Sequence, residues 1–280
     1  MFDAVFPSDA APVLQRARGV LDVTLRRRGE ETVLEGLRQE GCLKARFPRG
    51  GTPGWRDAVV LNASGGIAAG DRLRLRFVVR AGGRASIAAQ AAERFYRAAP
   101  GDGPASVRTA LALEDGARAE WLPQETILFD GASLERALEV NMAADARFLG
   151  VESLVFGRAA MGESVRRLRL RDAIRVRRGG RLLLADMVRM GGDIAAALRR
   201  PAVADGARAV ATIVYVAPDA GEMVAPMRDA LAGGQAGASA WDGMLVARLL
   251  AADGAALRAA VIAALAVLRG TRNLPRVWRC

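Results

Sequence analysis

Histidine is absent from the 280-residue chain, and its two cysteines, Cys42 and Cys280, form no CxxC motif. The Ser-His-Asp triad, the Cys-His dyad and histidine-containing zinc sites all require imidazole and are therefore excluded. Any bound metal would be held by carboxylates, backbone oxygens, water or a single thiolate. Because two cysteines provide no disulfide framework, we expect a reducing, cytoplasmic setting.

Long apolar runs are also missing. The longest, residues 259–268, is about half of the ~20 residues that a membrane-spanning helix needs. The opening residues show no basic stretch before an apolar run, so no signal peptide is predicted. Since 51% of the side chains are apolar, the chain can bury a substantial core. We therefore expect one soluble domain over residues 1–280, with a disordered or extended segment 1–13 and an extended tail 271–280.

Lysine is nearly absent as well, because Lys44 is the single lysine among 41 basic residues. With 30 acidic residues, the net charge is +11. Such an excess favours a negatively charged partner. The arginines alternate with apolar residues instead of clustering, and aromatic residues make up only 5% of the chain, which argues against stacking on single-stranded nucleic acid. An acidic protein partner is favoured, and a basic nucleic-acid or polyanion-binding module is the alternative.

What the chain does contain is an apolar residue at every second position over much of residues 20–216, which predicts strands. Within residues 72–79, for example, Leu73, Leu75 and Phe77 alternate with arginines. Glycine-rich turn signals separate these segments and leave no room for helices between them. We predict a mainly β protein: an antiparallel, two-layer, sandwich-like or superhelical arrangement with a few helices, mostly towards the C-terminus.

The predicted helices cover residues 194–198, about 223–231, 241–251 and 255–268, the last ending before Gly270. The last two carry an amphipathic apolar stripe. This stripe either packs on the chain's own sheet or docks onto a partner.

A glycine-rich segment, residues 65–72, has the glycine spacing of a P-loop but lacks its Lys-Ser/Thr pair. Asp71 and Arg72 stand there instead, and a carboxylate would repel phosphate groups. The segment is otherwise a tight turn that needs glycine. Asp71 then either closes this turn or acts as a ligand.

Further polar residues gather near small residues and near Pro123, which suits a strand edge or a bulge. Each group forms either a structural corner with a solvated face or the wall of a wet crevice. Carboxylates alone, without a substrate pocket, specify no reaction. The candidates are Gln90, Glu93, Glu120, Gln124, Glu125, Glu152 and Glu163.

Several motifs in fixed order, from about residue 14 to the end, resemble the UreD family of urease accessory proteins, called UreH in some organisms. They are LRQEGCLK at 37–44, LNASGGIAAGDRL at 61–73, QAAERFYR at 90–97, EWLPQETI at 120–127, GRAAMGE at 157–163 and LPRVW at 274–278. Many family members have His-Pro-Pro before the glycine pair, where this chain has Asn62-Ala63-Ser64. A histidine contribution is therefore not implied. Ala89 stands where threonine is common.

The resemblance implies a mostly β scaffold without catalytic activity. Such a scaffold would dock on apo-urease, bind UreF and, through UreF, engage the GTPase UreG. The assembly would deliver Ni²⁺ to the urease site, whose bridging lysine must be carbamylated, through an internal water-filled passage. No tightly bound cofactor, membrane or nucleic acid is expected, and nickel is only in transit.

Weak oxygen ligands suit transit better than an imidazole or thiolate cage. The carboxylates expected along the nickel route are Asp71, Glu125 and Glu163. The residues expected in its polar wall, or at an interface, are Gln90, Glu93, Glu120, Gln124 and Glu152. The residues expected to dock a partner are Trp241, Leu245, Leu249 and Trp278. The rivals to this hypothesis are the polyanion-binding module and a histidine-free hydrolase with a carboxylate pair in a deep pocket.

Overall fold

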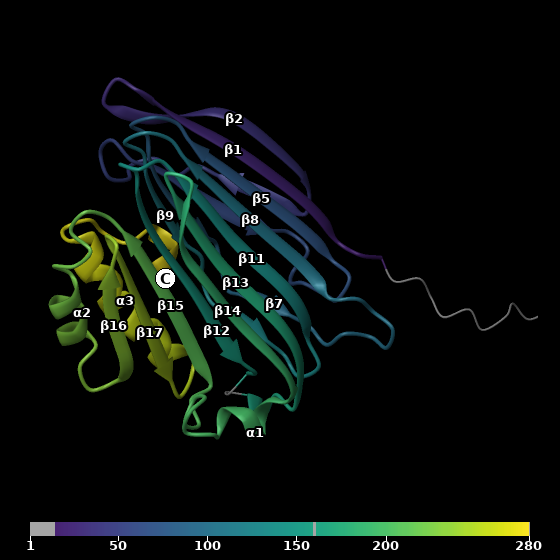
Figure 1. The fold of residues 1–280 in the computed structure, drawn as a ribbon. Coiled ribbons are helices and arrows are strands. Elements are labelled where there is room, and N and C mark those ends of the chain that lie inside the picture. The colour runs from purple at the N-terminus through teal and green to yellow at the C-terminus, as the bar shows by residue number, and fades with distance from the viewer. Residues whose placement is uncertain (1–14, 159–160, 280) are drawn as a thin grey trace, which may run out of the picture.

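A computed structural model describes residues 15–158 and 161–279, and the expectation for segment 1–13 lies outside these residues. The chain forms two β-sheets that lie face to face, with helices beside one of them (Figure 1). The prediction of a mainly β, two-layer protein with a few helices is confirmed.

The first sheet has seven strands. In spatial order they are β14 (Arg181–Asp193), β13 (Arg167–Arg178), β11 (Ser133–Met142), β8 (Ala105–Leu113), β5 (Arg72–Val79), β1 (Arg18–Arg28) and β2 (Glu31–Gly41). The second sheet has ten strands. Eight of them follow one path: β16 (Gln235–Trp241), β17 (Met244–Ala251), β15 (Ala209–Val216), β12 (Arg147–Phe156), β9 (Arg118–Leu122), β6 (Arg84–Ala89), β4 (Arg56–Asn62) and β3 (Leu43–Arg46). The other two are β10 (Thr126–Leu128) and β7 (Glu93–Phe95), and β10 pairs with both β12 and β7.

Between β5 and β13 the chain coils, because successive long strands alternate between the two sheets. Strands β5, β8, β11 and β13 of the first sheet are parallel to one another, and so are β4, β6, β9 and β12 of the second. The predicted antiparallel pairing is therefore wrong for the centre of both sheets. After each long strand the chain crosses to the opposite sheet and then returns. The strand formed on its return pairs with the previous strand of the same sheet and runs in the same direction. Antiparallel pairs flank these parallel strands, as in β1–β2, β13–β14 and β12–β15.

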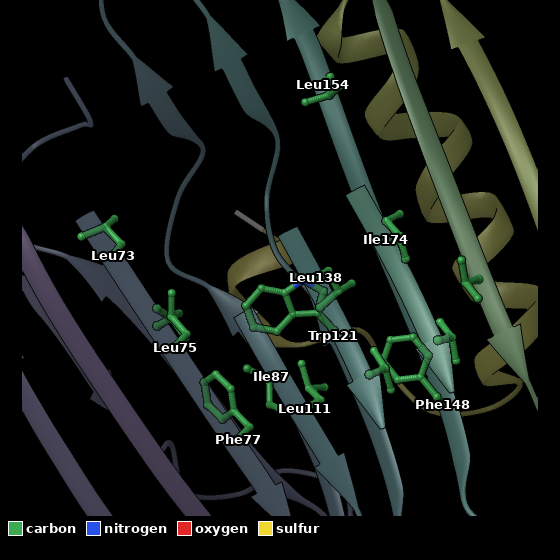
Figure 2. Close-up of a cluster of buried hydrophobic side chains, with 14 of the residues drawn as sticks. Leu73, Leu75, Phe77, Ile87, Leu111, Trp121, Leu138, Phe148, Leu154 and Ile174 are labelled. Carbon is green, nitrogen blue, oxygen red and sulfur yellow. The ribbon is translucent and has the colours of Figure 1, made fainter. Parts of the chain in front are cut away.

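The main core lies between the sheets and is made from their alternating apolar faces. Phe77 of β5 meets Trp121 of β9, with their ring centroids 5.9 Å apart (Figure 2). On the opposite face of β5 the arginines are exposed. The alternation read from the sequence thus places the apolar side chains of β5 inside and its arginines outside.

A second core covers the outer face of the second sheet, the face turned away from the first sheet. Helices α2 (Val224–Ala230) and α3 (Gly254–Arg269) lie there, beside β15, β16 and β17 (Figure 1). Leu257, Val261 and Leu265 of α3 are almost fully buried in this core. Helix α1 (Ile194–Leu198) lies apart from them, after β14.

Three of the four predicted helices are confirmed as α1, α2 and α3. The Asp253 carboxylate accepts a hydrogen bond from the Ala256 N–H, 2.8 Å away, and so caps the start of α3. Gly270 ends α3 with φ of +56°.

The predicted helix over 241–251 is wrong, because these residues belong to the hairpin of β16 and β17. Asp242 and Gly243, with φ of +50° and +69°, form its turn. Leu245 and Leu249 share one face of a strand just as they would share one face of a helix, so their four-residue spacing fits both structures.

The C-terminal tail is packed rather than extended throughout. Residues Arg276–Trp278 form a 3-10 turn after Pro275. Trp278 is 3% exposed, and its indole N–H donates to the Leu122 carbonyl oxygen, 2.9 Å away. The tail therefore completes the second core. Among residues 15–158 and 161–279, no helix is long and apolar enough to cross a membrane.

Candidate functional site

A cavity of about 260 Å³ lies between the two sheets, near β7 and the ends of β4, β6 and β9. Most of its wall is apolar, including Leu75, Phe95 and Trp121. A small set of polar side chains converges on this apolar space, which is the usual composition of a binding site. The polar side chains are Asn62, Gln90, Glu93, Thr109, Gln124, Thr126, Arg136 and Glu152, and Arg94 also borders the cavity.

A buried ionic cluster forms one part of the wall. Arg136, on the inner face of β11, makes a two-point contact with Asp172 of β13, with nitrogen–oxygen distances of 2.9 and 2.6 Å. A third Arg136 nitrogen lies 2.7 Å from Glu152 Oε2 and donates to Thr126 Oγ1, also at 2.7 Å. Trp121 Nε1 donates to Glu152 Oε1, 2.8 Å away. Two carboxylates therefore surround one guanidinium, which gives the cluster a net negative charge.

Glu152 is the member of this cluster that borders the cavity with a free acceptor. Its Oε2 pairs with Arg136 by charge but accepts no hydrogen bond within the described residues. Burial raises the pKa of Glu152, Arg136 lowers it, and Asp172 raises it again. Burial makes ionisation of this carboxylate unfavourable, and no hydrogen-bond donor among the described residues stabilises its Oε2. Such an oxygen can accept a proton, a hydrogen bond from water or a cation.

Glu93, at the start of β7, is the second carboxylate of the cavity. The Asn62 side-chain amide donates to both of its oxygens, at 3.2 and 3.1 Å. Burial raises the pKa of Glu93, and the hydrogen bond from Asn62 partly offsets that effect. The Asn62 amide oxygen in turn accepts from the N–H and hydroxyl of Ser64. The Asn-Ala-Ser segment thus orients the Glu93 carboxylate, and exposed Gln90 lies beside it on the wall.

The glycine pair identified in the sequence forms part of the same wall. The Tyr96 hydroxyl donates to the Gly65 carbonyl oxygen, 2.7 Å away. A Cβ added to Gly66 would lie 2.4 Å from the Tyr96 ring, and its φ of +143° is unfavourable for other residues. Glycine is therefore needed for this close contact, and the segment is a tight turn rather than a phosphate loop.

Gln124 connects the cavity to the C-terminal tail. Its side-chain N–H donates to the Val277 carbonyl oxygen, 2.8 Å away, and its side-chain oxygen accepts from Arg258 of α3. Gln124 is buried, so both ends of its amide are fixed. The cavity wall and the second core are therefore held together at this residue.

The three carboxylates predicted for the nickel route lie outside the cavity wall. Asp71 accepts from the N–H groups of Ala17 and Ala68, at 2.7 and 2.8 Å, and closes its turn. Glu125 lies 3.4 Å from Arg258, with which it forms an ion pair.

Glu163, the third of them, is held by the Arg158 side chain and by the N–H groups of Arg158 and Asp130. Burial raises the pKa of Glu163, but these hydrogen bonds together lower it by more than burial raises it. The net shift of its pKa is therefore downwards. The geometry thus gives all three carboxylates partners that fix local structure.

Four of the five residues predicted for the polar wall do border the cavity, namely Gln90, Glu93, Gln124 and Glu152. The fifth, Glu120, lies on the opposite face of the second sheet. It is 1% exposed and accepts from Ser86 and Arg269.

Of the four residues predicted to dock a partner, only Trp241 is on the surface, with 43% of it exposed. Leu245, Leu249 and Trp278 are at most 3% exposed and belong to the second core. These three side chains face the interior of the protein, because the sheet, the helices and the tail bury one another.

Sequence reasoning missed Arg136, Asn62 and Thr126. Arg136 sits in an alternating strand among many arginines, and nothing local distinguishes it from a surface residue. Only the pairing of β11 with β13 brings it next to Asp172. The sequence partly indicates Asn62, because this residue begins the Asn-Ala-Ser motif. Within the described parts of the chain, no group of three cysteine, aspartate or glutamate side chains is placed to hold a metal ion.

Comparison with known proteins gives a consistent result. The family model described as "UreD urease accessory protein" matches residues 17–279. The urease accessory protein UreD of Dinoroseobacter shibae is 45% identical over 271 residues, covering 96% of this chain and 94% of that protein. The UreD proteins of Methylobacterium sp. (strain 4-46) and Xanthobacter autotrophicus are 46% and 45% identical, covering 90% and 94% of this chain and 90% of each relative.

Proposed function

The chain belongs to the UreD family of urease accessory proteins and has a role in urease maturation, and we propose that Ni²⁺ passes through the cavity between its sheets. In this proposal the protein is a scaffold that docks on apo-urease, binds UreF and, through UreF, engages the GTPase UreG. The ion is cargo, and no cofactor stays bound.

The observation that supports passage is the pair of carboxylates, Glu93 and Glu152, on the wall of one cavity. Both are partly or fully buried, and the side chains around them offer oxygen ligands but neither imidazole nor thiolate. Ni²⁺ is held tightly by imidazole and thiolate, so oxygen ligands and water let it leave again. Conduction requires binding that is favourable at entry and weak enough for release.

Arg136 moderates the attraction of this cavity for a cation. Its guanidinium neutralises part of the charge of Glu152 and Asp172, so the cluster attracts a divalent ion without forming a deep trap. We assign Glu93 and Glu152 to the nickel route, with Gln90, Gln124 and Asn62 as its polar wall. We exclude Asp71, Glu125 and Glu163 from the proposed route because they lie outside the cavity wall.

The geometry gives little support to a hydrolase. Glu152 and Asp172 are the buried carboxylate pair that such an enzyme would need, but Arg136 contacts both. The curated relatives are named accessory proteins. We therefore propose that the protein has no catalytic activity of its own.

The test is reconstituted activation of apo-urease by the assembled accessory proteins. The double variant E93Q/E152Q should lower the rate of nickel incorporation about tenfold or more, since each lost carboxylate raises the barrier for a divalent ion. The control variant E125Q/E163Q removes the same charge outside the cavity and should transfer nickel at nearly the normal rate. Co-purification with UreF must be unchanged in both. Normal nickel incorporation by E93Q/E152Q would contradict the assignment.

Docking and location are further proposals. Trp241 is the large exposed side chain at the β16–β17 hairpin, and we assign it to the UreF-binding surface. Trp241→Ala should weaken co-purification with UreF, and unchanged recovery would remove it from that role.

We also propose a cytoplasmic location, supported by the unpaired Cys42 thiol.

A further inference from the structure

A second pocket, of about 550 Å³, opens on the outer face of the second sheet beside the end of α3. Basic side chains outnumber acidic ones in its wall. The arginines are Arg84, Arg118, Arg147, Arg269 and Arg272, and the acids are Glu120 and Asp219. This pocket is separate from the cavity, because the second sheet lies between them.

Three of these arginines stand side by side on neighbouring parallel strands. Arg118 of β9 is in register with Arg84 of β6 on one side and with Arg147 of β12 on the other. Adjacent strands are about 4.8 Å apart, so the three residues span roughly 10 Å on one face. Like charges directly opposite each other on neighbouring strands are destabilising.

None of these three arginines has an acidic partner within residues 15–158 and 161–279. The two acids of the pocket have other partners. Glu120 pairs with Arg269 at 3.0 Å and with Arg272 at 2.5 Å, and Asp219 accepts from the Tyr215 hydroxyl at 2.9 Å. Among the described residues, the pocket wall thus carries about three more positive than negative charges.

Two further observations indicate that this pocket favours an anion. Nη1 of Arg272 is buried and donates a hydrogen bond to no acceptor among the described residues, although the guanidinium stacks on the Trp55 ring, 4.0 Å away. Burial lowers the pKa of Arg118, and Arg147, Arg84 and Arg272 lower it further. Arginine charges that destabilise one another, next to an unpaired N–H group, are what a site for an anion contains before the anion binds.

We propose that this pocket binds a phosphate group through Arg84, Arg118, Arg147 and Arg272. The planar guanidinium offers pairs of N–H donors that match the oxygen spacing of phosphate. An excess of about three positive charges favours a dianion over a single carboxylate. The group is either inorganic phosphate or the phosphate end of a nucleotide, since both present the same oxygens.

The experiment measures phosphate binding by the full-length protein, alone or in its accessory complex, using calorimetry and thermal unfolding. Inorganic phosphate should bind saturably and raise the melting temperature more than sodium chloride of equal ionic strength does. R118Q/R147Q should weaken binding about tenfold or more, the loss expected for charge-assisted hydrogen bonds. The control R72Q/R76Q removes two exposed arginines from the first sheet and should change binding less than about twofold.

Two more measurements distinguish the possible outcomes. Without phosphate, R118Q/R147Q should be at least as stable as the unsubstituted protein, because repulsion between neighbouring arginines is relieved. If the double variant does not fold, Arg147→Gln alone serves, and it should also weaken binding. ATP that competes with phosphate and binds more tightly would identify a nucleotide as the ligand, and equal or weaker binding of ATP would identify inorganic phosphate.

Either source supports the proposal, whereas three results would overturn it. They are a phosphate effect no larger than that of chloride, unchanged binding by R118Q/R147Q, and equal loss of binding in R72Q/R76Q. Failure here is distinguishable from failure of nickel passage, because E93Q/E152Q changes the inner cavity and leaves these arginines in place.

Discussion

The two faces of the second sheet carry opposite charge balances, although the same strand, β9, contributes to both. Trp121 points inward and donates to Glu152, whereas its neighbour Glu120 points outward and pairs with Arg269. Inside, two carboxylates share one arginine. Outside, five arginines and two acids line one pocket, and Glu120 pairs with two of those arginines. Strand alternation therefore lets one sheet present a cation-attracting wall and an anion-attracting wall a few ångströms apart.

The comparison also shows how each cluster tolerates burial. Within the parts of the chain that the structure describes, each charged group of the inner cluster has an ionic partner, and the buried atom that accepts no hydrogen bond is Oε2 of Glu152. In the outer pocket, the buried atom without a hydrogen-bond partner among the described residues is Nη1 of Arg272. Buried groups without partners are costly, so the two free atoms mark where a passing or bound ion would be stabilised.

The largest expected effect on stability comes from removing the guanidinium of Arg136 from the inner cluster. Arg136→Met should lower the free energy of unfolding by about 3–5 kcal/mol at neutral pH, because it leaves Glu152 and Asp172 buried beside each other without compensation. Urea denaturation measures this loss, and Arg169→Met, at an exposed position of β13, is the control. The loss should shrink as the pH falls and the carboxylates are protonated. An effect as small as that of Arg169→Met would mean that the cluster is not buried as described.

Glu120→Gln removes a buried charge from the outer face and should destabilise the protein less than Arg136→Met does. It should lower the free energy of unfolding by about 2–3 kcal/mol, since Arg269 loses a buried charged partner. The same change makes the outer pocket more positive and should tighten phosphate binding. Denaturation and calorimetry on one protein sample measure both results. Weaker phosphate binding in a folded variant would show that Glu120 helps to form the site instead of opposing it.

Glu93→Gln should change the free energy of unfolding least, and it should raise this free energy, whereas the two preceding substitutions lower it. Because the pKa of Glu93 is raised in the folded state, its ionisation costs stability above the unfolded-state pKa of about 4.3. The variant should therefore be more stable than the unsubstituted protein at pH 7. The difference should disappear as the pH falls through this pKa range, where Glu93 becomes protonated. Destabilisation at pH 7 would instead indicate that the ionised carboxylate stabilises the fold.

Much of the fold follows from local sequence pattern, but the strand directions do not. The alternation in β5 and the capping residues around α3 are local, so they predict those elements directly. Whether the next strand joins the same sheet or the opposite one is decided by long-range packing. The parallel pairing was therefore not predictable from turn signals. Leu245 and Leu249 show a second ambiguity, since a spacing of four residues fits both a helix face and a strand face.

The candidate site was only partly predictable for a similar reason. The sequence places Glu93 and Glu152 near small or apolar residues, and the coil of strands brings them to one cavity. Asp71, Glu125 and Glu163 have the same chemistry in the sequence, but backbone and arginine partners engage them in the fold. Arg136 has no local signal that separates it from exposed arginines.

The most direct test of the central claim is to close the inner cavity reversibly and follow nickel. Ala92 borders the cavity, so Ala92→Cys in a background lacking Cys42 and Cys280 can carry a bulky disulfide-linked label. The nickel content of apo-urease is then measured over time in the assembled complex. We predict that labelling stops nickel incorporation while the complex stays intact, and that removing the label with a reductant restores it. Nickel that arrives at the unlabelled rate while the label is in place would contradict passage through this cavity.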